Sequence, residues 1–121
     1  MKCDRNLVRK MLLEIENQES GYAPVNIVIE DHNQEQIRYH AYIMTQGGLI
    51  ESMNCTNLNS NSPQAIPKNL TWEGHEFIEA ARNDTLWKKA MNMVNEKGGS
   101  ITISALSQLL SSLMKQQFNL S

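Results

Sequence analysis

Cysteine is scarce in this sequence, and the two cysteines that occur, Cys3 and Cys55, stand alone. Neither belongs to a Cys-x-x-Cys pair, and no histidine lies at a metal-ligand spacing from either of them. A disulfide framework and a structural zinc site are therefore not expected. We interpret both residues as free thiols.

Long hydrophobic runs are also missing. Charged residues interrupt the first fifteen positions, among them Lys2, Asp4, Arg5, Arg9 and Lys10, so this stretch lacks the uninterrupted apolar segment of a signal peptide. No apolar run elsewhere approaches the roughly 20 residues that cross a bilayer. We therefore expect a cytoplasmic protein with no membrane partner.

Glycine, proline and positive charge are modest as well. Six Gly and three Pro in 121 residues, with 40% hydrophobic residues, are typical of one ordered globular domain. The formal net charge of −2 argues against strong non-specific binding to nucleic acid, although it leaves room for a local basic patch.

Motifs for catalysis and cofactor binding are absent too. Residues 75–79 begin like the zinc motif His-Glu-x-x-His, but Glu79 stands where the second histidine must be. The glycine pairs 47–48 and 98–99 follow helical patterns, so they are expected to end helices and not to cradle phosphates. No nucleophile has a base and an orienting group at a recognisable spacing. We predict no enzymatic activity, no cofactor and no metal.

Helical periodicity is what the sequence does contain. Apolar residues recur at helical spacing behind Asp4, which is expected to cap a first helix over residues 4–18. Similar patterns predict further helices over residues 31–46, 71–82, 85–97 and 104–118. Strands are predicted at Val25–Ile29, Leu49–Cys55 and Ile66–Leu70, with a polar loop between the last two.

The order helix, strand, helix, hairpin, helix resembles a winged helix, in which Gly48-Leu49-Ile50 leads into the wing hairpin. We predict an α+β, winged-helix-like domain with a small antiparallel sheet of three strands over residues 1–82. A C-terminal helical extension over residues 83–121 is expected to pack on the same domain.

A more specific resemblance spans nearly the whole chain. It is carried, in this order, by the segments MKCDRNLVRKMLLEIE, IRYHAYIMTQGGLIE, LTWEGHEFIEAARNDTLW and EKGGSITISAL. These segments resemble an uncharacterised family of small bacterial and prophage proteins, known only as a domain of unknown function. The resemblance implies the winged-helix-like fold and a bacterial or prophage setting, but no catalytic or ligand-binding residue.

The second predicted helix is the one that would enter the major groove in a DNA-binding winged helix. Helical projection turns Ile37, Ala41 and Met44 inward. It turns a mostly uncharged set outward: Glu35, Arg38, Tyr39, Tyr42, Ile43 and Gln46. Outward aromatic residues with a single base are typical of protein interfaces. Three alternatives could cover this outward face: the chain's own C-terminal helices, a protein partner or DNA.

The candidate site residues follow from this projection. For a protein or DNA partner they are Arg38, Tyr39, Tyr42, Ile43 and Gln46 on the helix and Lys68 at the wing. For DNA phosphates they are Lys2, Arg5, Arg9 and Lys10, for which solvated surface is the plainer alternative.

Two further predictions concern apolar positions. The last helix has a leucine stripe that is either core or the seam of a homodimer, formed by Leu106, Leu109, Leu110 and Leu113. His40 lies on the apolar side of its helix and is predicted to be a core histidine bonded to backbone. His32 is expected in a surface loop.

From these observations we expect a non-enzymatic binding protein that acts through protein–protein interaction or transcriptional regulation. One alternative is a sequence-specific DNA-binding winged-helix repressor. Another is a mobile-element inhibitor of a host defence protein, which the acidic balance of the chain would suit if the target is basic.

Overall fold

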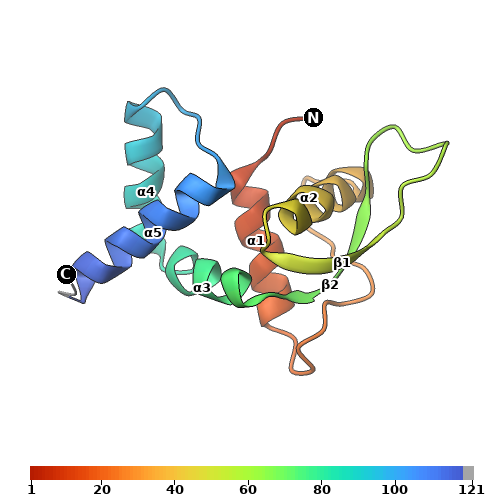
Figure 1. The fold of residues 1–121 in the computed structure, drawn as a ribbon, viewed down its shortest axis with the longest axis horizontal. Coiled ribbons are helices and arrows are strands. Elements are labelled where there is room, and N and C mark those ends of the chain that lie inside the picture. Colours follow the sequence, from red (N-terminus) through yellow and green to blue (C-terminus); the bar gives the residue numbers. More distant parts are fainter. Residues whose placement is uncertain (119–121) are drawn as a thin grey trace. The chain divides into compact units, whose positions relative to one another are not determined.

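The structure is a computed structural model that describes residues 1–118. In chain order the elements are α1 (Arg5–Glu16), α2 (Gln34–Gln46), β1 (Ile50–Asn54), β2 (Ala65–Leu70), α3 (Trp72–Ala81), α4 (Asp84–Glu96) and α5 (Ile103–Gln117) (Figure 1). The predicted α+β class is confirmed. The chain divides into two compact units, one over residues 1–75 and one from Glu76 onward, so the boundary falls inside α3. Among the described helices, none has the length and apolar character needed to cross a membrane.

The first helix forms as its sequence predicts. The Asp4 side chain accepts hydrogen bonds from the backbone N–H groups of Asn6 and Leu7, at 3.0 and 3.2 Å. These bonds satisfy donors that the first turn of a helix otherwise leaves unpaired. The predicted apolar stripe is buried throughout: Leu7, Val8, Met11, Leu12 and Ile15.

Helix α2 begins at a capping box. The Asn33 side chain accepts from the backbone N–H of Gln36, and the Gln36 side chain accepts from the backbone N–H of Asn33. Ile37, Ala41 and Met44 are buried, as predicted. This fixes which face of α2 is turned away from the core.

The sheet has two strands where three were predicted. β1 and β2 pair antiparallel from Ile50 opposite Leu70 to Asn54 opposite Ala65, with one irregularity between Glu51 and Ser52. The strand predicted at Val25–Ile29 is wrong: within residues 1–118 this part of the chain pairs with β2 only through an isolated bridge of Tyr22 with Asn69, beside a 2.7 Å bond from the Ala23 N–H to the Lys68 carbonyl.

The chain leaves the sheet directly after this bridge. Pro24 has no N–H to continue the ladder. Beyond it, Ile27 and Ile29 are buried, whereas Val25 and Val28 are 90% and 77% exposed. The alternation that suggested a strand therefore anchors an irregular segment to the core.

A close backbone approach joins Leu49, the residue before β1, to the first turn of α3. The Thr71 hydroxyl accepts from the Gly74 N–H at 3.0 Å and donates to the Gly48 carbonyl, so Thr71 caps α3. A Cβ atom on Gly74 would lie 2.0 Å from the Leu49 carbonyl oxygen. Only glycine permits this contact without a shift of the backbone.

The second unit contains the remainder of α3 together with α4 and α5. Asn83 caps α4 by accepting from the Leu86 N–H, and Thr102 caps α5 by accepting from the Ala105 N–H, both at 3.1 Å. Helix α4 packs on α5. The buried side chains of these two helices are Leu86, Trp87, Ala90, Val94, Leu106, Leu110 and Leu113.

Candidate binding surface

The outer side of α2 and the hairpin loop form a polar surface in the first unit. We call it the α2–loop surface and define it by Gln34, Glu35, Arg38, Tyr42 and Gln46 together with residues 55–64. The loop rises from the hairpin and lies beside α2 (Figure 1), and the Ser62 hydroxyl donates to a carboxylate oxygen of Glu35 at 3.3 Å. A cleft of about 300 Å³ separates the two, lined by Gln34, Glu35, Arg38, Asn57, Asn59, Ser60, Asn61 and Gln64.

The loop is organised by its own short polar side chains. The Cys55 N–H donates to the Gln64 carbonyl at 3.0 Å, and the Thr56 hydroxyl accepts from the Gln64 N–H at 2.8 Å. The Asn57 side chain accepts from the Asn59 N–H at 2.8 Å. These bonds hold the amide-bearing residues of the loop opposite α2.

Within residues 1–118, Arg38 is the only cationic side chain that lines the cleft. Arg38 as a whole is half-buried, and its guanidinium makes no hydrogen bond or ion pair with another group among residues 1–118. Glu35 is the single carboxylate, and the other lining side chains are neutral amides and a hydroxyl. The cleft therefore offers many donors and acceptors but no net charge, which suits a ligand that presents both.

The aromatic residues of α2 are less exposed than their helical projection indicated. Tyr39, Tyr42 and Ile43 are all half-buried. The Tyr39 ring meets the His40 ring edge to face at 5.8 Å between centroids, and the Gln46 amide donates to the Tyr42 hydroxyl at 3.1 Å. The tyrosines thus contribute a partly covered rim, not a wide apolar patch.

The predicted basic residues are not gathered at the cleft. Lys68 is exposed on β2 but is not among the residues that line the cleft. On and before α1, Lys2 and Lys10 are exposed, whereas Arg5 and Arg9 are half-buried and interact with other groups of the chain. Of the four candidate phosphate contacts, Lys2 and Lys10 are therefore more accessible to solvent than Arg5 and Arg9.

The leucine stripe of α5 is largely covered within a single chain. Leu106, Leu110 and Leu113 are at most 5% exposed, and Leu109 is intermediate. Their burial needs no second copy of the protein. This favours core over dimer seam for the three buried leucines.

His40 is a core histidine held by backbone, as predicted. It is 2% exposed, with Nδ1 2.7 Å from the Gln36 carbonyl oxygen and Nε2 accepting from the Asp4 N–H at 2.9 Å. Burial lowers the pKa of His40 below its ordinary value of 6.5.

Asp4 and His32 lie beside this contact. His32 Nε2 is 3.3 Å from the Asp4 carboxylate, and its Nδ1 is 2.9 Å from the Glu30 carbonyl oxygen. Partial burial acts to raise the pKa of Asp4, but the bonds from the Leu7 N–H, His32 and the Asn6 N–H outweigh it and lower the pKa. Among the described residues, no group of three or more His, Cys, Asp or Glu side chains is placed to hold a metal ion.

The fold and this surface define a small α+β protein with a polar, amide-lined cleft. The chain belongs to the family described as "Hypothetical protein (DUF2513)", which matches residues 2–100. It is 30% identical over 117 residues to an uncharacterized protein of Haemophilus influenzae strain Rd, covering 96% of this chain and 98% of that protein. No solved structure matches the chain. The predicted membership of an uncharacterised family is thus confirmed.

Proposed function

We propose that this protein is a winged-helix-like, non-enzymatic binding protein of bacterial or prophage origin that contacts another protein through the α2–loop surface. The observation that carries the proposal is the guanidinium of Arg38, which has no partner within residues 1–118 and lies in a cleft where Glu35 is the other charged side chain. A partly buried Arg with open donors beside tyrosines is a common anchor in protein interfaces.

The arrangement of elements supports the winged-helix interpretation. Helix α2 runs directly into an antiparallel hairpin with a long loop, and Tyr22 approaches β2 on the chain segment between α1 and α2. In a winged helix, the helix before the hairpin and the hairpin loop contact the same ligand. Here the same two parts line one cleft.

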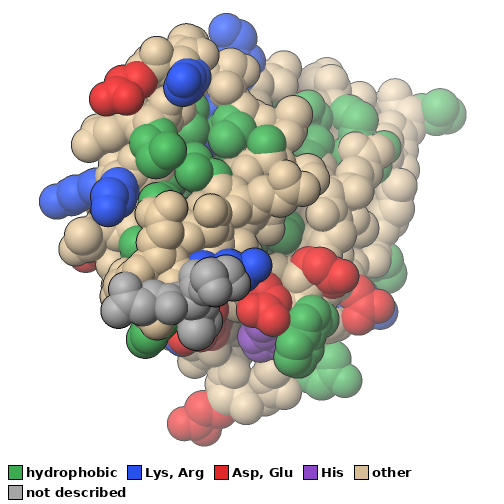
Figure 2. Space-filling view, turned by 60° about the vertical axis from the view of Figure 1, so that its left-hand side comes forward, with side chains coloured by type: hydrophobic (Ala, Val, Ile, Leu, Met, Phe, Trp, Pro, Cys, Tyr) green, Lys and Arg blue, Asp and Glu red, His purple; other side chains and the backbone are tan. Residues whose placement is uncertain are grey.

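The charge of the cleft favours a protein over DNA. Binding to a duplex gains affinity from several Lys or Arg side chains that displace counterions from phosphates. The cleft offers one such side chain, Arg38, with Glu35 beside it. Figure 2 shows a different face, the one on the left in Figure 1, where Lys and Arg side chains occur together with Asp and Glu side chains.

Affinity capture from a bacterial host, with nuclease treatment, tests the proposal. The native sequence is compared with Arg38→Glu and with Lys88→Glu, which makes the same charge change at an exposed position of α4. We expect a bound protein that survives nuclease with the native sequence and with Lys88→Glu but is lost with Arg38→Glu. Equal retention by both variants would overturn the assignment to the α2–loop surface.

A DNA-binding repressor is the second candidate, because Arg, Asn and Gln are the side chains that read base edges. An electrophoretic shift at low salt that disappears by moderate salt and requires Arg38 would select it over the protein partner. An inhibitor of a host defence protein would instead appear in the capture experiment, as a defence protein retained through Arg38.

A further inference from the structure

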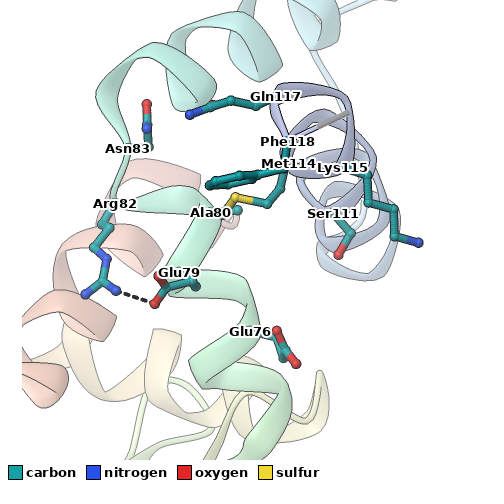
Figure 3. A pocket seen from close by; sticks show the side chains of 10 residues that line it. All are labelled: Glu76, Glu79, Ala80, Arg82, Asn83, Ser111, Met114, Lys115, Gln117 and Phe118. Carbon is teal, nitrogen blue, oxygen red and sulfur yellow. Dashed lines mark hydrogen bonds and ion pairs between the residues drawn. The ribbon is translucent and has the colours of Figure 1, made fainter. Parts of the chain in front are cut away.

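A second surface lies in the second unit, between α3 and α5. Its apolar floor consists of Ala80, Met114 and Phe118; Figure 3 shows the Met114 and Phe118 side chains directed from α5 toward α3. Phe118 is 62% exposed although it lines the floor. We call this pocket of about 500 Å³ the α3–α5 groove; its other lining residues are Glu76, Glu79, Arg82, Asn83, Ser111, Lys115 and Gln117.

The two walls of the groove carry opposite unpaired charges. Glu79 and Arg82 form an ion pair within α3, so they neutralise each other (Figure 3). Glu76 on α3 and Lys115 on α5 are both exposed, and neither makes an ion pair or hydrogen bond through its side chain within residues 1–118. A ligand that meets the apolar floor therefore encounters a free anion on one wall and a free cation on the other.

We propose that the α3–α5 groove binds an amphipathic helix of a partner protein. The lining runs over two helical turns on each wall, from Glu76 to Asn83 and from Ser111 to Phe118, which is roughly 10 Å at 1.5 Å per residue. An incoming helix of that length places apolar side chains at positions i, i+4 and i+7 on the floor. A Lys or Arg of this helix faces Glu76, and an Asp or Glu faces Lys115.

A second copy of this chain fits the groove less well. A stable dimer of two folded chains buries about 800 Å² on each partner, which a groove two helical turns long does not supply, whereas a single helical segment docks within such a groove alone. The three leucines that would extend such an interface along α5 are buried within the chain: Leu106, Leu110 and Leu113. The charge pattern, in contrast, needs only one anion and one cation from the incoming helix.

The test uses the full chain and a phage-displayed library of helical 12-residue peptides, so no natural partner has to be known. We expect enrichment of peptides with apolar residues at i, i+4 and i+7 and a basic residue on one flank. In fluorescence anisotropy, Phe118→Ala and Met114→Ala should weaken a selected peptide about tenfold or more. Met93→Ala, at a partly exposed position of α4 outside the groove, should leave binding unchanged.

Charge reversal identifies the orientation of the peptide. Glu76→Lys should weaken binding, and replacing the basic residue of the peptide by Glu should restore it. Phe118→Ala should keep the melting temperature of the native protein, since the side chain is 62% exposed, so a loss of binding is separable from a loss of folding.

Three results would overturn the proposal. The library could yield no enriched helical pattern, or the selected peptides could bind Phe118→Ala and Met114→Ala as tightly as the native protein. The third is a dimer of this chain that disappears with Phe118→Ala. The inference is independent of the proposed function. Arg38→Glu should leave peptide binding at the α3–α5 groove unchanged.

Discussion

The backbone N–H of Asp4 donates a hydrogen bond to Nε2 of His40 across 2.9 Å. Because Nε2 is the acceptor, Nδ1 carries the proton and donates to the Gln36 carbonyl at 2.7 Å, so the buried ring is neutral. Asp4 also caps α1 through its carboxylate. One residue thus joins the start of α1 to the middle of α2.

Acidification should destabilise the protein through His40. Its pKa in the folded state lies below the ordinary value of 6.5, so between these two values the unfolded chain binds a proton that the folded chain does not. Stability is therefore fully present above pH 6.5 and falls as the pH decreases below it, by up to about 1.4 kcal/mol per pH unit. Urea unfolding between pH 7.5 and 5.5 measures this slope.

The control for that slope is His40→Gln, which removes the titrating group and should flatten the profile in the same window. A native protein whose stability stays constant or increases on acidification would contradict the buried neutral ring.

Removing the cap of α1 should cost stability, whereas replacing it by another capping residue should not. Asp4→Ala deletes the acceptor for the N–H groups of Asn6 and Leu7 and should lower the free energy of unfolding by about 0.5–2 kcal/mol. Asp4→Asn retains an acceptor oxygen and should lose much less. Equal losses in the two variants, measured by chemical denaturation, would mean that the cap contributes little.

Gly74→Ala should destabilise the protein, although alanine is the better helix former. In an exposed helix this change stabilises by roughly 1 kcal/mol. Here the new Cβ would lie 2.0 Å from the Leu49 carbonyl oxygen, so the start of α3 and the backbone of Leu49 must separate, at a cost of about 2 kcal/mol or more. Thermal unfolding shows whether Gly74→Ala raises or lowers the melting temperature.

Gly48→Ala is the matched control for this steric effect. Its backbone is left-handed at φ +79°, but no atom lies within 4 Å of an added Cβ. The expected loss is about 1 kcal/mol, from backbone strain alone. A stabilised Gly74→Ala variant would contradict the close approach of α3 to Leu49.

Leu110→Ala should lower the free energy of unfolding by about 2–5 kcal/mol, because Leu110 is 1% exposed in a single chain. Leu109→Ala, at the half-exposed position beside it, should cost clearly less. Both effects should be independent of protein concentration. If the stability of the native protein decreased on dilution and Leu110→Ala removed this concentration dependence, Leu110 would lie in a dimer seam and not in the core.

Much of the fold follows from local patterns in the sequence. The apolar stripe of α1 and the caps Asp4, Asn33 and Thr71 are encoded within a few residues of the helices that they start, so their positions are predictable. The core role of His40 follows in the same way, from its place on the apolar side of α2.

The features that failed depend on contacts between distant segments. A run such as Val25–Ile29 alternates like a strand, but whether it pairs with β2 depends on Pro24 and on where β2 lies. Helical projection likewise gives the direction of Tyr42 but not the cover over it. The cleft around Arg38 needed the fold of residues 55–64 back onto α2, which no local pattern encodes.

Site-specific photo-crosslinking in a bacterial host tests the central claim most directly. A benzophenone-bearing phenylalanine is placed at Tyr42 or Asn59 on the α2–loop surface, and at Lys88 on α4 as the control. The proposed function predicts a protein adduct from positions 42 and 59 that withstands nuclease and is missing from position 88. An adduct formed only from position 88, or only to nucleic acid, would contradict it.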